Sequence, residues 1–359
     1  MDTDRRTVLK ASGIAALVGS TGLAGCSGGL LGGGGGSGSS GPESWQYDPS
    51  LLGDASNAFF GSMDYATIYE NRQFLPEETR NSLEQTDSST PVSPEDIDYL
   101  SGVGGGSVSM MDSSGSGAGS VAVAGSFDQG AVTDQVESEG SATEVGEYEG
   151  YTLYEDSSVG QQMGPDASGS ATVGISDSAL VAGFAFASGT STSSSGQDAV
   201  ETAIDSSNGN ADPLRGNNDF ATTVADNLGD ATASFGGVGD PQLIEQFSAM
   251  ADSQTQTYVE GMRAGGFGMT LEGETTTFTV VLAYESAQAA SDTGLADLVS
   301  GFGPQVEEQQ DGINEVSAST NDNAVTITVE GDTLTLLEQA NQTGGMTGVA
   351  SMSAPAGGS

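Results

Sequence analysis

Residues 262–283, MRAGGFGMTLEGETTTFTVVLA, decide the fold class of this chain. Two runs rich in apolar, β-branched and glycine residues, 262–271 and 275–283, flank the short turn Glu272-Gly273-Glu274. A glycine-containing turn between two such runs is typical of a β-hairpin. The stretch therefore predicts two antiparallel strands.

The same pattern recurs along the chain. Paired runs that predict further hairpins are 107–111 with 120–124, 144–148 with 151–154, 171–175 with 179–186, and 316–319 with 325–329. Between and after them, capping residues and helical spacing predict six helices. One follows Asp128, one begins at Asp240, one runs from after Ser286 to about residue 299, and the others cover 197–206, 219–228 and 332–340. We therefore expect an α+β fold in which antiparallel β-hairpins are packed with helices.

The two halves of the folded part follow a similar order of hairpin, helix and hairpin. Their strand-to-helix junctions are also alike, Ser126-Phe127-Asp128 in one half and Ala283-Tyr284-Glu285 in the other. We interpret this as two similar α+β lobes, 45–240 and 241–342. The alternative is that any α+β chain shows such similarities between its halves, because turns and helix caps use few residue types.

Two short segments carry local expectations of their own. The alternation in Tyr65-Ala66-Thr67-Ile68-Tyr69 predicts a strand. Ser93-Pro94-Glu95-Asp96 has the composition of a helix start, so residues 97–100 are expected to form a helix of little more than one turn.

The first residues of the chain have the composition of an export signal. Arg5 and Arg6 precede a short, glycine-interrupted apolar run over 11–24. That order indicates a signal peptide, and paired arginines indicate the twin-arginine route. The alternative is a transmembrane helix, but a span needs roughly 20 apolar residues and this run is shorter. We assign residues 1–25 to a twin-arginine signal peptide.

Leu23-Ala24-Gly25-Cys26 resembles the lipobox of secreted lipoproteins. The resemblance implies cleavage before Cys26 and attachment of lipid to its sulfur, which would anchor the protein to the outer side of the cell membrane. Cys26 is the sole cysteine, so an intramolecular disulfide is excluded. After it, residues 26–44 are rich in Gly and Ser and are expected to form a flexible tether, and residues 343–359 a disordered tail.

The chain is strongly acidic. It has 50 Asp and Glu against 7 Lys and Arg, a formal net charge of −43, and no histidine. Such self-repulsion opposes a compact state at low ionic strength, whereas in molar salt the Debye length falls to about 3 Å. This composition resembles that of proteins secreted by extremely halophilic archaea. The excess of acids also argues against nucleic-acid binding, because phosphates need a basic surface.

The order of the predicted strands and helices resembles that of known groups of proteins. Two short segments share in this resemblance, Gly146-Glu147-Tyr148-Glu149-Gly150-Tyr151 and Asn218-Asp219-Phe220. The chain resembles a broad group of uncharacterised twin-arginine-exported lipoproteins of extremely halophilic archaea. It is also weakly similar to an uncharacterised family of membrane-anchored extracellular bacterial proteins. These resemblances imply an envelope location and bring no known activity.

Missing residue types exclude several chemistries. Without histidine the chain has no Ser-His-Asp triad and no His-ligated metal, and its sole lysine, Lys10, lies in the predicted signal. An EF-hand-like count over 208–219 fails because Pro213 stands where glycine is needed. We expect no catalytic residue, no metal site and no cofactor. A pair of carboxylates that hydrolyses glycosides stays open.

The sequence leaves one candidate for modification. Asn341-Gln342-Thr343 is a glycosylation sequon near the C-terminus. We therefore predict a lipid-anchored extracytoplasmic protein of a halophile, a structural, interaction or binding module of the cell envelope rather than an enzyme. Its partners would be the membrane, through Cys26, and an envelope protein or a small solute. The alternatives are a substrate-binding protein that serves a transporter and a hydrolase that uses two carboxylates.

Overall fold

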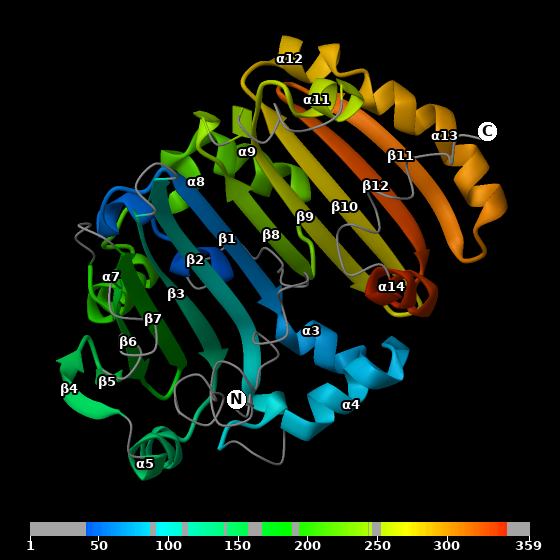
Figure 1. The fold of residues 1–359 in the computed structure, drawn as a ribbon. Helices are drawn as coiled ribbons and strands as arrows, with labels where there is room; N and C mark the ends of the chain where they lie inside the picture. Colours follow the sequence, from blue (N-terminus) through cyan, green and yellow to red (C-terminus); the bar gives the residue numbers. More distant parts are fainter. Residues whose placement is uncertain are drawn as a thin grey trace, which may run out of the picture.

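The fold is one large antiparallel sheet with helices on both faces (Figure 1). The computed structural model describes residues 41–86, 91–109, 114–139, 142–156, 167–188, 194–242, 244–245 and 253–342. Within these ranges the sheet has 12 strands in the order β11-β12-β10-β9-β8-β1-β2-β3-β7-β6-β5-β4. The predicted α+β fold of antiparallel hairpins and helices is confirmed.

The longest strands are β2 and β3, and the shortest are β4, β5 and β8. The strand bounds are β1 Asn57–Asp64, β2 Ile97–Ser109, β3 Ser114–Gly125, β4 Thr143–Tyr148, β5 Tyr151–Asp156, β6 Ala167–Ile175, β7 Ala179–Ser188, β8 Ala233–Val238, β9 Met262–Glu272, β10 Thr275–Tyr284, β11 Ile313–Asn321 and β12 Ala324–Asp332.

Helices connect the hairpins. Their bounds are α3 Tyr65–Glu70, α4 Glu77–Thr86, α5 Gln129–Glu139, α7 Gly196–Ser207, α8 Leu214–Asn217, α9 Asp219–Leu228, α11 Ser253–Val259, α12 Ala287–Asp292, α13 Leu295–Gln309 and α14 Thr333–Gln342, and the 3-10 helices are η2 Pro42–Trp45, η3 Pro49–Leu52, η4 Arg72–Phe74 and η5 Pro94–Asp96. In the described part of the chain, none of these helices combines the length and the apolar character that crossing a bilayer requires.

The strand order repeats within the chain. β1, β2 and β3 are neighbours, and β7 returns to pair with β3, with β6 beside it. In the same way β8, β9 and β10 are neighbours, and β12 returns to pair with β10, with β11 beside it. The two runs meet where β1 pairs with β8. Because the sheet is continuous there, two separate lobes are not confirmed, and the second run begins at Ala233, before residue 240.

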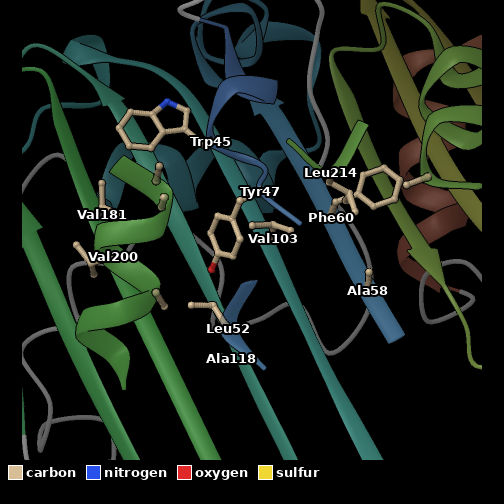
Figure 2. Packing of buried hydrophobic residues seen from close by; sticks show 14 of the residues in the cluster. Trp45, Tyr47, Leu52, Ala58, Phe60, Val103, Ala118, Val181, Val200 and Leu214 are labelled. Atoms are coloured by element: carbon tan, nitrogen blue, oxygen red, sulfur yellow. The ribbon is translucent and has the colours of Figure 1, made fainter. Parts of the chain in front are cut away.

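One side of the sheet, called here the α7 face, packs against α7, α9 and the N-terminal segment. Its strand residues include Ala58, Phe60, Val103, Ala118, Val181 and Ala185. Figure 2 shows the fully buried Tyr47 beside Val103 and Leu52, with Val200 of α7 in the same cluster. Each large apolar side chain buried here contributes roughly 1.5–3 kcal/mol, so this cluster fixes the two halves to one core.

The opposite side of the sheet, called here the groove face, is covered in three places. Val132 and Val136 of α5 lie in a cluster with strand residues of β3, β6 and β7. Leu336 and Leu337 of α14 lie in a second cluster with strand residues of β9 and β10. Side chains of α12 and α13 lie in a third cluster with Tyr284 and Val325. The remaining part of this face, over β1, β2, β3 and β7, is the site described below.

Two local predictions were wrong. Residues 65–69 form helix α3, because the Asp64 carboxylate accepts hydrogen bonds from the Thr67 N–H at 2.8 Å and from its hydroxyl at 2.7 Å and so caps the helix. Residues 97–100 begin strand β2, because Ile97 and Leu100 pair with β3. Only the three-residue helix η5 precedes them. In both places a contact outside the local pattern decides the conformation.

Candidate binding groove

The groove is built from cross-strand rows that place glycine on two central strands and phenylalanine beside them. A cross-strand row consists of residues that are paired side by side on neighbouring strands, and the side chains of one row point to the same face of the sheet. One row reads Phe59, Gly104, Gly119 and Phe184 across β1, β2, β3 and β7. Two rows beside it read Asn57, Gly106, Gly117, Phe186 and Phe235, Gly61, Gly102, Val121.

The glycines of β2 and β3 therefore give the floor no side chains of its own. The phenylalanine rings of β7 lie over β3, and the floor over β2 stays open. Phe59, Phe184 and Phe186 are 51%, 42% and 39% exposed, which is high for large apolar residues. The rings of Phe59 and Phe235 stack with centroids 6.3 Å apart. Ile244 closes the end of the groove near β8, where its side chain lies against Gly239.

The local sequence explains why the central strands carry glycine. A Cβ on Gly119 would stand 2.5 Å from the Val103 carbonyl oxygen and 3.0 Å from Cζ of Phe184. The ring of Phe184 can lie over β3 only because no side chain is present there. Glycine within a strand often marks such a close approach by another group.

The groove has a volume of about 650 Å³, within the range of ligand sites in proteins. Its lining holds only Gly, Ala, Val, Leu, Ile, Met, Phe, Ser and Asn residues. In a chain with a net charge of −43, none of the described residues that line it is acidic or basic. The groove is therefore the uncharged, apolar part of a highly charged surface.

The polar side chain at the β1 end of the groove is already engaged within the protein, and those of β2 and β3 point away from the groove. Asn57 donates from Nδ2 to Ser56 Oγ at 3.3 Å and accepts at Oδ1 from the Asp240 N–H at 2.8 Å. Ser107 and Ser116, whose hydroxyls lie 3.4 Å apart, alternate with the groove-facing Gly106 and Gly117 and so point to the α7 face. A ligand in the groove would consequently be held by apolar contacts.

The residues predicted from the sequence lie elsewhere. Arg5, Arg6 and Cys26 fall outside the described residues, as does the predicted tail 343–359. Asn341 belongs to the last turn of α14. The segment 208–212 follows α7 and leads to the pairing of Tyr47 with Pro213, and within the described ranges no three Asp, Glu, His or Cys side chains form a group that could hold a metal.

Arg215 and Arg263, which could have bound an anionic solute, are used in ion pairs. Arg215 pairs with Glu43 and, at 2.6 Å, with Asp226, which ties the N-terminal segment to α9. Arg263 pairs with Glu285 at 2.5 Å. Neither arginine lines the groove, so the groove offers an anion no positive charge.

Comparisons with known proteins give distant likenesses. No family model matches the chain, and no curated protein matches it. Among solved structures, crystal forms IV, III and I of TP0453 are similar to it at 11%, 12% and 9% sequence identity, with TM-scores of 0.37, 0.38 and 0.37. The matches cover 82%, 81% and 86% of this chain and 97%, 96% and 99% of those chains. At these TM-scores the likeness does not assign the chain to a family.

Proposed function

We propose that this protein is a lipid-anchored, extracytoplasmic binding module of a halophile's cell envelope, and that its groove binds an apolar molecule. The anchor part of the proposal rests on Arg5, Arg6 and the lipobox-like Leu23-Ala24-Gly25-Cys26. The binding part rests on one observation. An uncharged groove of about 650 Å³, with three partly exposed phenylalanines, interrupts a surface rich in carboxylates.

Soluble proteins rarely expose a contiguous apolar surface of this size unless that surface binds another molecule. Removing the groove-facing rings from water would contribute about 25 cal/mol per Å² of apolar area buried. In molar salt the driving force for burying apolar surface is further strengthened by excluded salts such as sulfate. An apolar ligand is thus the one that this site would hold most strongly.

The other two functions lack support in the groove. A substrate-binding protein for an anionic solute would need a positive group in the site, and Arg215 and Arg263 are engaged elsewhere. A carboxylate hydrolase would need two acids beside the ligand, and the described part of the chain places no acid in the groove lining. Catalysis is no part of the proposal.

The anchor is tested by Cys26→Ser. The variant is expected in the medium and the unchanged protein in the membrane fraction, both assayed in molar salt. Retention of the variant in membranes after a high-salt wash would contradict a lipid anchor on Cys26.

Binding is tested with the neutral dye Nile red, whose fluorescence rises in apolar surroundings. The full-length Cys26→Ser chain in molar salt is expected to bind it at one saturable site. A combined Phe59→Ser and Phe184→Ser variant should weaken binding at least tenfold, since each buried ring contributes more than about 1.4 kcal/mol. Exposed Leu51→Ser together with Leu334→Ser is the matched control. Equal loss in both variants, or no saturable binding, would contradict the proposal.

A further inference from the structure

We propose that the occupant of the groove is one hydrocarbon chain of a membrane lipid, extended along β2 with its polar head outside the groove. This inference rests on the proposed function and names the ligand class of the same site. Three features of the described residues support it: the shape of the groove, its lack of free polar groups, and the way the matching place in the second half is filled.

The groove is longer than it is wide. Its lining runs along β1 from Asn57 to Met63, which at the rise of an antiparallel strand is about 20 Å. Across the strands, the backbones of β1 and β7 are three strand spacings apart, about 14 Å, and rings enter from both sides. The space between the rings is therefore a narrow channel parallel to the strands, which suits a chain better than a compact molecule.

The groove-facing surface offers a ligand few hydrogen bonds. The side chain of Asn57 is engaged with protein groups, and Ser107 and Ser116 alternate with the groove glycines and so point to the α7 face. The N–H and C=O groups of the floor face along the sheet and are used in the pairing of β2 with β1 and β3. A polar ligand would lose its hydrogen bonds with water and gain none, a cost that a hydrocarbon chain does not have.

The second half of the sheet shows what covers the matching place. The strand order makes β9 and β10 the counterparts of β2 and β3. Near the turn between β9 and β10, Leu271 and Phe278 lie in one cluster with the aliphatic side chains Leu336 and Leu337 of α14. In the first half the matching strands carry glycine and no aliphatic group of α7 covers them, because α7 lies on the α7 face. A hydrocarbon chain would supply the missing aliphatic layer.

The first arm of the test measures chain length. Full-length Cys26→Ser protein in molar salt is loaded with Nile red, which is then displaced by octanol, decanol, dodecanol, tetradecanol and hexadecanol. Affinity is expected to rise by up to about fourfold per CH₂, corresponding to about 0.8 kcal/mol, until the channel is filled, and then to level off. Affinity that does not depend on chain length would overturn the inference. Because Nile red binding would remain, the proposed function would survive that result.

The second arm identifies the source of the chain. The same protein is incubated with phosphatidylcholine vesicles that contain a pyrene-labelled phosphatidylcholine and is then separated from them. Recovery of about one labelled lipid per protein is expected. If alkanols bind but no lipid is recovered, the occupant is not a membrane lipid and the inference is wrong. If an amphipathic helical peptide displaces Nile red and alkanols do not, the groove is a protein interface, and the inference is also wrong.

Variants of the floor locate the chain. Gly102 and Gly104 have room for a methyl group, since the nearest atoms to an added Cβ are 3.4 Å away in both cases. Combined Gly102→Ala and Gly104→Ala should therefore fold and should weaken hexadecanol binding by tenfold or more. Combined Gly265→Ala and Gly301→Ala adds the same two methyl groups where there is also room but outside the groove. Equal affinity of the two double variants would overturn the placement along β2.

Fluorescence of Trp45 reports folding in each variant. It is the chain's single tryptophan and is buried in the cluster that includes residues of the α7 face. A floor variant that retains native Trp45 fluorescence and loses hexadecanol binding supports the inference.

Discussion

The ring of Phe186 lies against Gly117, its partner on the neighbouring strand, so closely that a Cβ on Gly117 would stand 2.7 Å from Cε1 of the ring. The ring covers a backbone that glycine leaves bare. The same relationship joins Phe184 and Gly119. Glycine on β3 and phenylalanine on β7 are thus parts of one arrangement, in which the rings lie down over the sheet and leave the channel over β2 open.

Gly117→Ala should destabilise the protein. The added methyl would push Phe186 off the strand, and overpacking of this kind costs about 1–3 kcal/mol. The free energy of unfolding, measured with guanidinium chloride at constant high ionic strength, checks this prediction. Phe186→Leu should reduce the cost of Gly117→Ala when the two are combined, because a smaller side chain leaves space for the methyl group.

Gly102→Ala is the matched control on the same face. Its methyl group would meet its nearest neighbours at 3.4 Å, an ordinary contact. The unfolded chain would lose freedom, so the change should be neutral or stabilising by about 0.4–1 kcal/mol. Equal destabilisation by the two changes would mean that sheet propensity, and not the position of the ring, decides the effect.

Adjacent glycines of β9 should respond in opposite ways. A Cβ on Gly266 would collide with Cγ1 of Val224 in α9, whereas a Cβ on Gly265 meets its nearest atom at 3.5 Å. Gly266→Ala should therefore lower the free energy of unfolding by about 1–3 kcal/mol, and Gly265→Ala should not. Thermal unfolding followed by near-UV circular dichroism distinguishes them. A similar melting temperature for both would show that α9 can shift away from the sheet at little cost.

Much of the fold follows from sequence periodicity. The hairpin over 262–283 and the helix over 219–228 occur where local patterns predict them. What local patterns do not contain is the order of the strands. The pairing of β1 with β8 joins residues far apart in the chain, and that pairing makes one sheet out of two expected lobes. Helix α3 was missed for a similar reason, since the Asp64 cap outweighs an alternation of only five residues.

The groove could have been predicted in part. Gly102, Gly104 and Gly106 alternate along one strand, and Gly117 and Gly119 alternate along the next. Alternation places all of them on one face of a hairpin. The predicted hairpin, however, pairs 107–111 with 120–124 and leaves 112–119 as its connection, which hides the second series. The phenylalanines that form the sides of the groove come from β1, β7 and β8. Their convergence depends on strand order, which the sequence does not reveal.

Tyr148 should make stability fall at alkaline pH. Its hydroxyl donates to Asp205 Oδ1 at 2.9 Å, and that bond to a carboxylate raises the pKa of Tyr148 to about 12. The folded pKa lies above the unfolded value of about 10. The contribution is therefore complete below about pH 10 and is lost as pH rises toward about 12.

Tyr148→Phe should thus lower the melting temperature at neutral pH and flatten its decline over that alkaline range. The loss at neutral pH should be about 1 kcal/mol or less, because the pair is partly exposed. Tyr258→Phe removes a tyrosine hydroxyl on α11, outside the pair of Tyr148 and Asp205, and serves as the control. If the alkaline decline is as steep in Tyr148→Phe as in the unchanged protein, the bond to Asp205 does not cause it.

Folding should depend on salt, and Arg215 should affect that dependence. Its guanidinium stands between Glu43 and Asp226, whose side chains are 47% and 59% exposed. In molar salt such exposed pairs contribute at most about 1 kcal/mol, so Arg215→Gln should be nearly neutral there. At lower ionic strength, and without a cation between them, the two carboxylates would repel each other and the rest of a chain of net charge −43.

We expect the unchanged protein to lose its near-UV circular dichroism on dialysis below about 0.5 M salt, and Arg215→Gln to lose it at a higher salt concentration. Glu43→Gln removes one acid from the same site and should act in the opposite direction or have little effect. A spectrum that does not change with salt would contradict salt-dependent folding. Equal midpoints for the two variants would show that neither the ion pair at Arg215 nor these changes in net charge set the salt requirement.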